Sequence, residues 1–252
     1  MKTIEPFTPI QYVMGSTEFC GLPISVDQRV LIPRPETEIL AEMAIEHAGL
    51  CSAILRQQQS RPCDALRIDA EPVEAAKVGD VKILDLCTGS GCIAIALAEA
   101  LTKGPTNCRI IASDISSDAL SVARQNAVRN GVDERVVFIK SDLFECIDGE
   151  FDIIVSNPPY IARHEFPTLQ EEVLREPTIA LDGGEDGLEY YRRIIPAMHR
   201  HLRRGGCAMF EIGYGQRSAV CEIIEKSGDF KINRVKKDFN GIDRIVVAEW
   251  IN

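Results

Sequence analysis

The sequence lacks the spacings that mark a metal site, since no Cys-x-x-Cys pair and no cysteine–histidine spacing typical of zinc occurs in its 252 residues. Its nine cysteines are odd in number, and several, such as Cys92 and Cys207, fall inside apolar runs, where cysteine behaves as a small hydrophobic residue. Free thiols in a chain of this size indicate a reducing compartment. The four histidines have no sequence neighbours that suggest a Ser/His/Asp triad. We therefore expect neither metal chemistry nor triad hydrolysis.

Long apolar runs and an excess of basic residues are also missing. No stretch is long enough to cross a bilayer, and residues 1–6 show no apolar signal region, so we expect a cytoplasmic protein that does not associate with a membrane. The 28 basic residues are outnumbered by 38 acidic ones, for a net charge of −10. Because phosphate contacts need a basic face, we expect no direct specificity for nucleic acid.

What the chain does have is the composition of a globular protein, with 45% hydrophobic residues and enough length for a full core. Residues 1–35 are rich in turn formers and short apolar runs, which predicts a hairpin-like lead-in rather than a helix. Residues 36–80 open with a helical pattern, and residues 51–80 then lose their periodicity, which predicts a loop or a partly helical insertion. Residues 81–252 form the third region.

In this third region, short apolar strands alternate with helices, which predicts a doubly wound α/β fold with a parallel sheet covered on both faces. We expect its strands at 81–86, 109–113, 136–140, 151–155 and 207–212, and its helices at 92–101, 118–130, 188–203 and 216–226. Gly205-Gly206 is expected to end the helix at 188–203. Two further strands, near 230–237 and 242–249, are joined by Asn240-Gly241 and are expected to form an antiparallel hairpin.

A glycine-rich turn follows the strand at 81–86. In doubly wound sheets, ligands bind beyond the carboxyl ends of the strands, and glycines there let the backbone approach them closely. Asp114 ends the second strand, where a carboxylate can accept both hydroxyls of a ribose, and Asp142 follows the third, where it can meet an adenine amino group. This pattern also fits the dinucleotide fingerprint, so alone it leaves dehydrogenase and methyltransferase open. The predicted turn comprises Cys87, Thr88, Gly89, Ser90 and Gly91.

The fourth strand, at 151–155, runs into the tetrapeptide Asn157-Pro158-Pro159-Tyr160. Its two prolines remove backbone donors and stiffen the loop. The side-chain carbonyl of Asn157 and the backbone carbonyl of Pro158 are then two fixed acceptors for the hydrogens of an –NH₂ group, and Tyr160 offers a ring to a planar group. Such a loop predicts methyl transfer from S-adenosyl-L-methionine to a planar nitrogen, with positioning responsible for most of the rate.

Motifs along nearly the whole chain resemble the HemK/PrmC family, which methylates a glutamine side-chain amide in peptide-chain release factors. The most specific is Leu31-Ile32-Pro33-Arg34-Pro35-Glu36-Thr37-Glu38; others are Tyr12-Val13-Met14-Gly15, Asp85-Leu86-Cys87-Thr88-Gly89-Ser90-Gly91, the tetrapeptide and Ala180-Leu181-Asp182-Gly183-Gly184-Glu185-Asp186-Gly187-Leu188. The resemblance implies a class I S-adenosylmethionine-dependent methyltransferase sheet preceded by a small β-hairpin. It assigns residues 87–91, Asp114, Leu143 and Asn157 to the cofactor. It assigns residues 157–160 to binding of the substrate glutamine, and it assigns Arg34 to substrate binding as well.

Three departures from the family pattern affect these expectations. Cys87 stands where the family usually has the first glycine of its motif, so the backbone there is expected to do without a positive φ. Leu143 sits where an aromatic residue is often found, which is expected to weaken the contact with adenine. We also expect that the family's N-terminal helical domain, which contributes to release-factor docking, is absent.

Three alternatives share parts of this pattern. A sister enzyme methylates a glutamine of a ribosomal protein and has a similar turn at 87–92, but its lead-in usually lacks the Pro-Arg-Pro-Glu-Thr-Glu form. A DNA adenine N6-methyltransferase shares the logic of the tetrapeptide, but it needs a basic groove that this sequence does not show. A non-catalytic cofactor-binding module would retain the fold, and the intact tetrapeptide at 157–160 argues against it.

Overall fold

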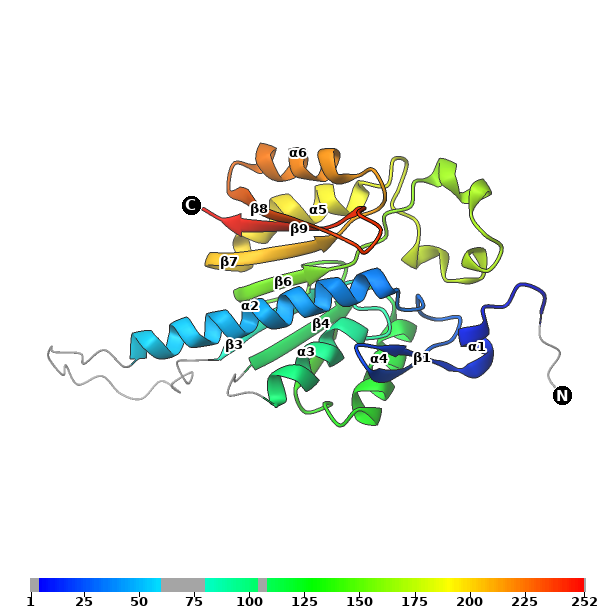
Figure 1. Ribbon diagram of the computed structural model, residues 1–252, viewed down its shortest axis with the longest axis horizontal. Helices are drawn as coiled ribbons and strands as arrows, with labels where there is room; N and C mark the ends of the chain where they lie inside the picture. Colours follow the sequence, from blue (N-terminus) through cyan, green and yellow to red (C-terminus); the bar gives the residue numbers. More distant parts are fainter. Residues whose placement is uncertain (1–4, 60–79, 104–107, 252) are drawn as a thin grey trace, which may run out of the picture.

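The computed structural model describes residues 5–59, 80–103 and 108–251. Its main element is a seven-stranded sheet with the order β5-β4-β3-β6-β7-β9-β8 (Figure 1). The strands are β3 (Val81–Leu86), β4 (Cys108–Asp114), β5 (Val136–Lys140), β6 (Phe151–Ser156), β7 (Leu202–Glu211), β8 (Phe230–Lys237) and β9 (Asp243–Trp250). From β5 to β7 the neighbours are parallel, whereas β9 is antiparallel to both β7 and β8. The strand order reverses between β3 and β6, where doubly wound sheets bind ligands.

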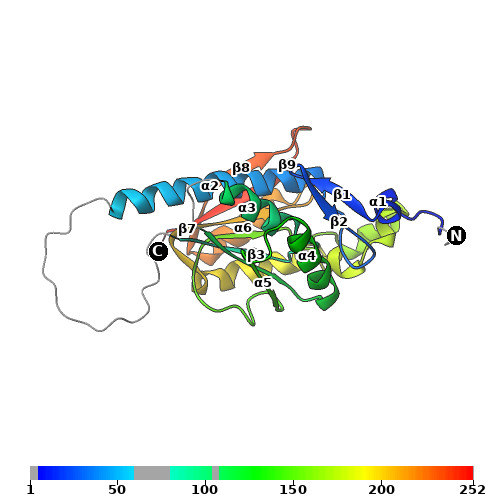
Figure 2. The ribbon, with the colours of Figure 1, turned by 90° about the horizontal axis from the view of Figure 1, so that it is seen from below.

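Helices cover both faces of this sheet (Figure 2). They are α2 (Pro35–Gln59), α3 (Cys92–Thr102), α4 (Ser117–Arg129), α5 (Glu189–Ala197) and α6 (Arg217–Ser227), with short 3-10 helices η1 (Arg163–Thr168), η2 (Val173–Arg175), η3 (Thr178–Ala180) and η4 (Met198–Arg200). Alternate strand residues face opposite layers: Ile83 packs with residues of α2, α3 and α4, and Leu84 with residues of α5 and α6. The sheet therefore separates two apolar cores and is buried on both faces.

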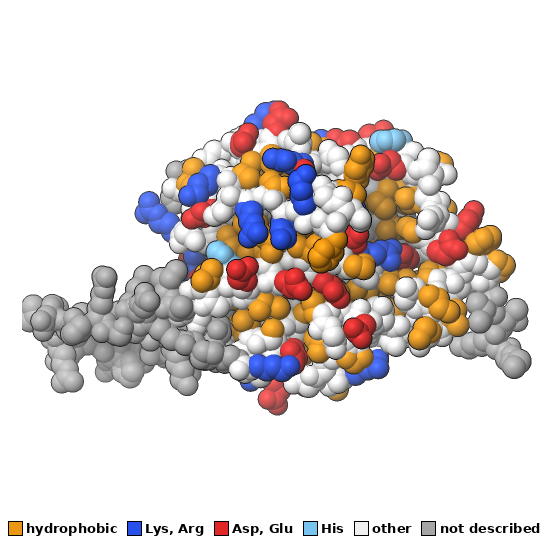
Figure 3. Space-filling view, in the orientation of Figure 1, with side chains coloured by type: hydrophobic (Ala, Val, Ile, Leu, Met, Phe, Trp, Pro, Cys, Tyr) orange, Lys and Arg blue, Asp and Glu red, His pale blue; other side chains and the backbone are white. Residues whose placement is uncertain are grey.

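The outer strand β8 ends the sheet with an edge that no other described strand pairs. It alternates cations with apolar residues and exposes Lys231, Arg234 and Lys237. Figure 3 shows basic side chains gathered over this part of the sheet. Charged side chains along an open edge hinder pairing with another chain, which explains this local basic cluster in an acidic protein.

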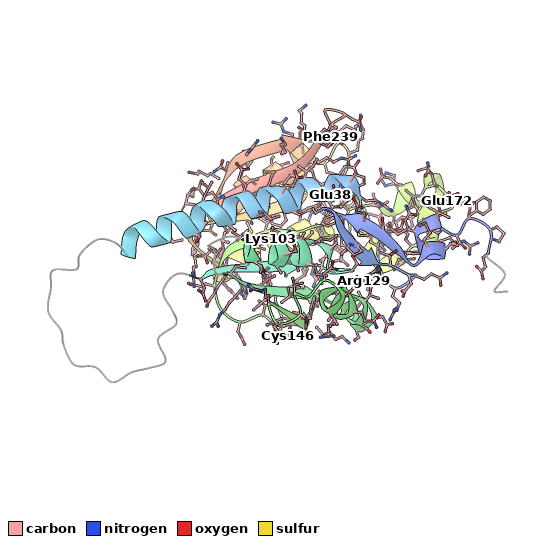
Figure 4. The ribbon with its side chains drawn as sticks, turned by 60° about the horizontal axis from the view of Figure 1, so that its bottom comes forward. Glu38, Lys103, Arg129, Cys146, Glu172 and Phe239 are labelled. Carbon is pink, nitrogen blue, oxygen red and sulfur yellow. The ribbon has the colours of Figure 1, made fainter. Side chains whose placement is uncertain are left out.

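The lead-in folds against α2 and α4 at the carboxyl end of the sheet (Figure 4). It consists of α1 (Ile10–Met14) and a two-stranded hairpin of β1 (Ser16–Phe19) and β2 (Leu22–Ser25). The backbone amide of Cys20 donates to the Glu38 carboxylate on α2 at 2.8 Å, and Arg129 of α4 donates to the Ser25 hydroxyl at 2.9 Å. These bonds hold the hairpin next to the strand ends.

The structure corrects the expectation that the lead-in contains no helix. The apolar run at 12–14 belongs to α1, because Gly15 closes a short helix with a φ of 74°. It also shows that α2 continues through Gln59, since residues 51–59 include the helix formers Ala, Leu, Arg and Gln. The rest of the predicted insertion, residues 60–79, lies outside the described residues.

A second correction concerns the segment at 188–203. Helical structure ends at Arg200, and β7 already begins at Leu202, so Gly205-Gly206 lies inside a strand instead of ending a helix. The register of β7 on β6 shifts here, because Phe151 pairs with Leu202 and Ile153 with Cys207. Glycines tolerate the unusual backbone of such an irregularity, and Gly205 has a φ of 74°.

Candidate functional site

A pocket opens beyond the carboxyl ends of β3, β4, β5 and β6, and we call it the sheet-edge pocket. Its lining includes Cys87, Gly89, Asp114, Asp142, Leu143 and Asn157. These six residues come from four different strand ends, so the parallel sheet brings together positions up to 70 residues apart. The assignment of each to a cofactor remains a prediction.

The other three residues of the glycine-rich turn do not line this pocket. Thr88 Oγ1 donates to Asp85 Oδ2 at 2.6 Å, and the Ser90 carbonyl accepts from the Asn126 side chain at 3.0 Å. A Cβ on Gly91 would lie 3.0 Å from the Cβ of Ala123, so glycine allows α3 to approach α4 closely. These residues shape the turn from inside the protein, while Cys87 and Gly89 face the pocket.

The backbone of the pocket adopts left-handed φ angles at two residues with side chains. Cys87 has a φ of 60° and Leu143 a φ of 52°. The expectation that residue 87 avoids a positive φ is therefore wrong. The neighbouring strand β4 holds the turn in this conformation, because the Thr88 amide donates to the Ser113 carbonyl at 2.9 Å. Such a conformation costs about 1–3 kcal/mol for a non-glycine residue and is found mainly where a site needs it.

Asp114 is half-buried in the wall, and its carboxylate is fixed by the backbone around it. Its Oδ2 accepts from the amide of Gly89 and its Oδ1 from the amide of Ser116, both at 2.9 Å. Burial raises the pKa of Asp114, and the two backbone hydrogen bonds partly oppose that shift. Each carboxylate oxygen can accept a further hydrogen bond, which suits a pair of ligand hydroxyls. Asp142, by contrast, is ion-paired with Arg193 at 2.7 Å.

A second pocket adjoins the first on the other side of the tetrapeptide, and we call it the loop pocket. Its lining includes Leu31, Arg34, Asn157, Pro158, Tyr160 and Leu169. Asn157 lines both pockets. Neither its Oδ1 nor the carbonyl of Pro158 accepts a hydrogen bond from any residue in the described ranges. Two residues that line the loop pocket, Asn157 and Pro158, thus each carry an acceptor that no described residue uses.

The tetrapeptide is clamped by the glycine-rich segment at 183–187. Ile161 forms a parallel bridge with Asp182, and a Cβ on Gly183 would lie 2.7 Å from the Cα of Tyr160. A Cβ on Gly187 would overlap the Tyr160 carbonyl oxygen, which accepts from Gln216 Nε2 at 2.8 Å. Glycine is required because the two backbones are in direct contact.

Arg34 lines the loop pocket, but its guanidinium is already paired. It forms a hydrogen-bonded ion pair with Glu176, whose carboxylate is almost fully buried. The other carboxylate oxygen of Glu176 accepts from the Ile32 amide at 2.9 Å. Arg34 therefore ties the lead-in to η2, and its predicted contact with substrate remains a prediction.

The sequence interpretation assigned no role to Glu211 or Asp85, two buried acids at the ends of β7 and β3. Burial raises the pKa of each carboxyl to about 7. The hydrogen bond from Thr88 opposes the shift at Asp85, and the neighbouring Thr37 side chain opposes the shift at Glu211. An acid that ends an apolar strand at the ligand edge of a parallel sheet is a signal that could have identified both.

The surroundings of the two pockets contain no metal-binding arrangement that the structure describes, since no three His, Cys, Asp or Glu side chains gather suitably in those residues. No helix among the described residues is long and apolar enough to cross a membrane.

Comparison with known proteins agrees with this architecture. A family model described as a methyltransferase domain matches residues 77–238. The chain is 39% identical over 240 residues to a release factor glutamine methyltransferase of Geobacter sulfurreducens, covering 94% of this chain and 72% of that one. It is 40% identical over 242 residues to the enzyme of the same name from Chlorobaculum tepidum, with the same coverage.

Among solved structures, it is similar to a ribosomal protein L11 methylase from Lactobacillus delbrueckii subsp. bulgaricus, with a TM-score of 0.53 and 22% identity, covering 86% of this chain and 79% of that one. This similarity supports the fold alone. The predicted class I methyltransferase sheet, with its preceding hairpin and its C-terminal antiparallel hairpin, is confirmed. On the identity and coverage of its relatives, the chain belongs to the family of release factor glutamine methyltransferases.

Proposed function

We propose that this chain transfers a methyl group from S-adenosyl-L-methionine to the side-chain amide nitrogen of a glutamine in a peptide-chain release factor. The observation that carries the proposal is the place of Asn157. It lines both the sheet-edge pocket and the loop pocket, and Pro158 lines the loop pocket beside it; neither the Oδ1 of Asn157 nor the carbonyl of Pro158 accepts a hydrogen bond from the described residues. This arrangement suits an –NH₂ group that must face a ligand in the neighbouring pocket.

The residues of the sheet-edge pocket fit the cofactor. Asp114 keeps acceptor capacity for the two hydroxyls of a ribose, and Gly89 leaves its backbone open to a ligand because no atom lies within 4 Å of a Cβ built there. Ile115 and Leu143 add apolar side chains suited to a planar base. When bound, S-adenosyl-L-methionine supplies an electrophilic methyl group on a sulfonium.

The residues of the loop then act on the amide by holding it. An amide nitrogen is a weak nucleophile, so orientation must account for much of the rate. Asn157 and Pro158 accept the two N–H groups and favour the positive charge that develops on the nitrogen. The ring of Tyr160 lies in the same pocket and can pack on the planar amide.

The cysteines support a reducing, cytoplasmic location as part of this proposal. All eight cysteines within the described residues are free thiols. Such a number of free thiols is typical of a reducing compartment.

Incubation with isotope-labelled S-adenosyl-L-methionine tests the proposal. Purified release factor, a ribosomal protein fraction and DNA are offered separately, and the modified residue is located by peptide mass spectrometry. We expect label on a glutamine of the release factor. Label only on ribosomal protein or on adenine would contradict the proposal, and so would normal cofactor binding with no transfer to any acceptor.

A further inference from the structure

We propose that Thr37 and Glu211 are positioning residues that fix the orientation of the Asn157 side-chain amide and so decide which of its ends faces the substrate. The inference rests on the proposed function, because it concerns how Asn157 is prepared for the glutamine amide. Thr37 lies in the first turn of α2 and Glu211 at the end of β7. Neither lines the sheet-edge pocket or the loop pocket.

The side chain of Asn157 is hydrogen-bonded to Thr37, and Thr37 in turn neighbours Glu211. Nδ2 of Asn157 donates to Oγ1 of Thr37 at 3.1 Å, and the Thr37 hydroxyl lies beside the Glu211 carboxyl, whose pKa it lowers. Thr37 is 3% exposed and Glu211 1%, so water does not compete for these bonds. A hydroxyl has a single proton, and a carboxylate only accepts. Once Glu211 is deprotonated, above its pKa of about 7, the proton of Thr37 is directed at the carboxylate, and Thr37 offers only lone pairs to Asn157.

This direction of the hydrogen bonds selects one orientation of the amide. The two ends of an asparagine amide have nearly the same shape, but one donates and the other accepts. An acceptor at Thr37 binds the Nδ2 end, which leaves Oδ1 on the side of the two pockets. If the amide were rotated by half a turn, its Nδ2 would face the –NH₂ group of the substrate. Both groups are donors, so no hydrogen bond could form between them. The bond to Thr37, with Glu211 beside it, thus presents the acceptor that the reaction requires.

Glu211 also reaches the other polar side chain of the tetrapeptide. The hydroxyl of Tyr160 donates to its Oε1 at 3.5 Å, a long hydrogen bond, and its backbone carbonyl accepts from Tyr191 at 2.7 Å. Its Oε2 is buried without a hydrogen-bond partner among the described residues. An ionised buried carboxyl with an unsatisfied oxygen destabilises a fold, so we attribute the presence of Glu211 to the site.

A pair of substitutions at Thr37 tests the inference. Thr37→Val removes the hydroxyl at nearly constant volume, and Thr37→Ser keeps it. Thr102→Val is the matched control, because Thr102 donates its hydroxyl to the Ala98 carbonyl in α3, away from both pockets. We expect Thr37→Val to lower kcat on release factor by roughly 10- to 100-fold, with KM and cofactor Kd changed less than about threefold. Thr37→Ser and Thr102→Val should retain kcat within about threefold of the wild type.

A second measurement needs no methyl acceptor. In protein labelled with ¹⁵N-asparagine, the side-chain NH₂ signal of Asn157 is identified by its absence from Asn157→Ala. We expect its protons to exchange slowly with water in the wild type and in Thr37→Ser, and faster in Thr37→Val.

The outcomes separate this inference from the proposed function. An unchanged kcat in Thr37→Val, or equal losses in the Val and Ser variants, overturns the positioning role. The same holds if amide exchange is alike in all three proteins. If the wild type does not methylate release factor, the proposed function is overturned, while the exchange measurement still decides whether Thr37 holds Asn157.

Discussion

Asn157 is the residue at which cofactor binding and transfer can be separated experimentally. It lines the sheet-edge pocket but is not among the groups that fix Asp114. We expect Asn157→Ala to lower kcat by roughly 100- to 1000-fold, comparable to removal of one polar group that stabilises a transition state. Cofactor binding, followed by calorimetry, should remain measurable. Asn233→Ala on exposed β8 is the control, and full turnover in Asn157→Ala would refute the role assigned to it.

Substitution of Asp114 should weaken cofactor binding itself. Asp114→Ala removes the acceptors predicted for the ribose and also releases the amides of Gly89 and Ser116. A hydrogen bond to a charged group contributes about 1.5–3 kcal/mol, so we expect cofactor affinity to fall by at least about 10-fold. Asp118→Ala, at an exposed position in the first turn of α4, should bind the cofactor as the wild type does. Retained affinity in Asp114→Ala would rule out the ribose contact.

At the scale of elements, the site depends on direct backbone contact between the tetrapeptide and the glycine-rich segment at 183–187. Gly187 and Gly228 both have a positive φ, near 76° and 75°, but only Gly187 lies against the tetrapeptide. No other atom would lie within 4 Å of a Cβ added at Gly228. Comparing alanine at the two positions therefore separates backbone strain from the clash with Tyr160.

We expect Gly228→Ala to lower the free energy of unfolding by about 1–2 kcal/mol, the cost of a left-handed alanine, and to leave kcat intact. Gly187→Ala should lose more stability and most of its activity, because Tyr160 must move. Chemical denaturation and turnover measure both effects. Equal stability and equal activity in the two variants would show that the segment at 183–187 does not clamp the loop.

The hairpin is a second element that supports the site from outside. Asn126 of α4 accepts from the Ser25 amide at 2.7 Å and donates to the carbonyls of Ser25 and Ser90, both at 3.0 Å. One fully buried amide thus connects β2 with the glycine-rich turn. The lead-in is consequently part of the methyltransferase unit and not a separate appendage.

For the whole molecule, the two buried acids make stability depend on pH. Burial raises the pKa of Asp85 from 3.8 and that of Glu211 from 4.5, each to about 7. Between these values the folded state binds protons that the unfolded state has released. The stability that they contribute is therefore complete below about pH 4 and is lost as the pH rises through about 7.

Removing one of these acids should flatten that dependence. We expect the free energy of unfolding of the wild type to fall more between about pH 5 and about pH 8 than that of Glu211→Gln. Glu172→Gln, at an exposed position beside η2, should behave as the wild type does. Denaturation curves at the two pH values measure the difference, and parallel changes in all three proteins would contradict the assignment to Glu211.

Much of the fold followed from local sequence patterns. The alternation of apolar strands and helices, the glycine-rich turn after β3 and the tetrapeptide after β6 were predicted from residues close together in the chain, because periodicity and turn chemistry act over short distances. The same local reasoning failed where a segment's context decides its state: Pro9 and Gly15 bound a helix in the lead-in, and Gly205 lies in an irregular strand.

What only the tertiary structure decided is which distant side chains meet. Thr37 and Asn157 are 120 residues apart, and Arg34 and Glu176 are 142 apart, yet each pair is hydrogen-bonded. The strand order places the ends of β6 and β7 side by side next to the start of α2, and no local pattern encodes that order. Likewise, Cys87 adopts a positive φ that its residue type disfavours, because surrounding contacts outweigh the local preference. The sequence alone therefore determined the place of the tetrapeptide at the end of β6 and predicted its chemistry, and the packing of remote elements determined how the Asn157 amide is held.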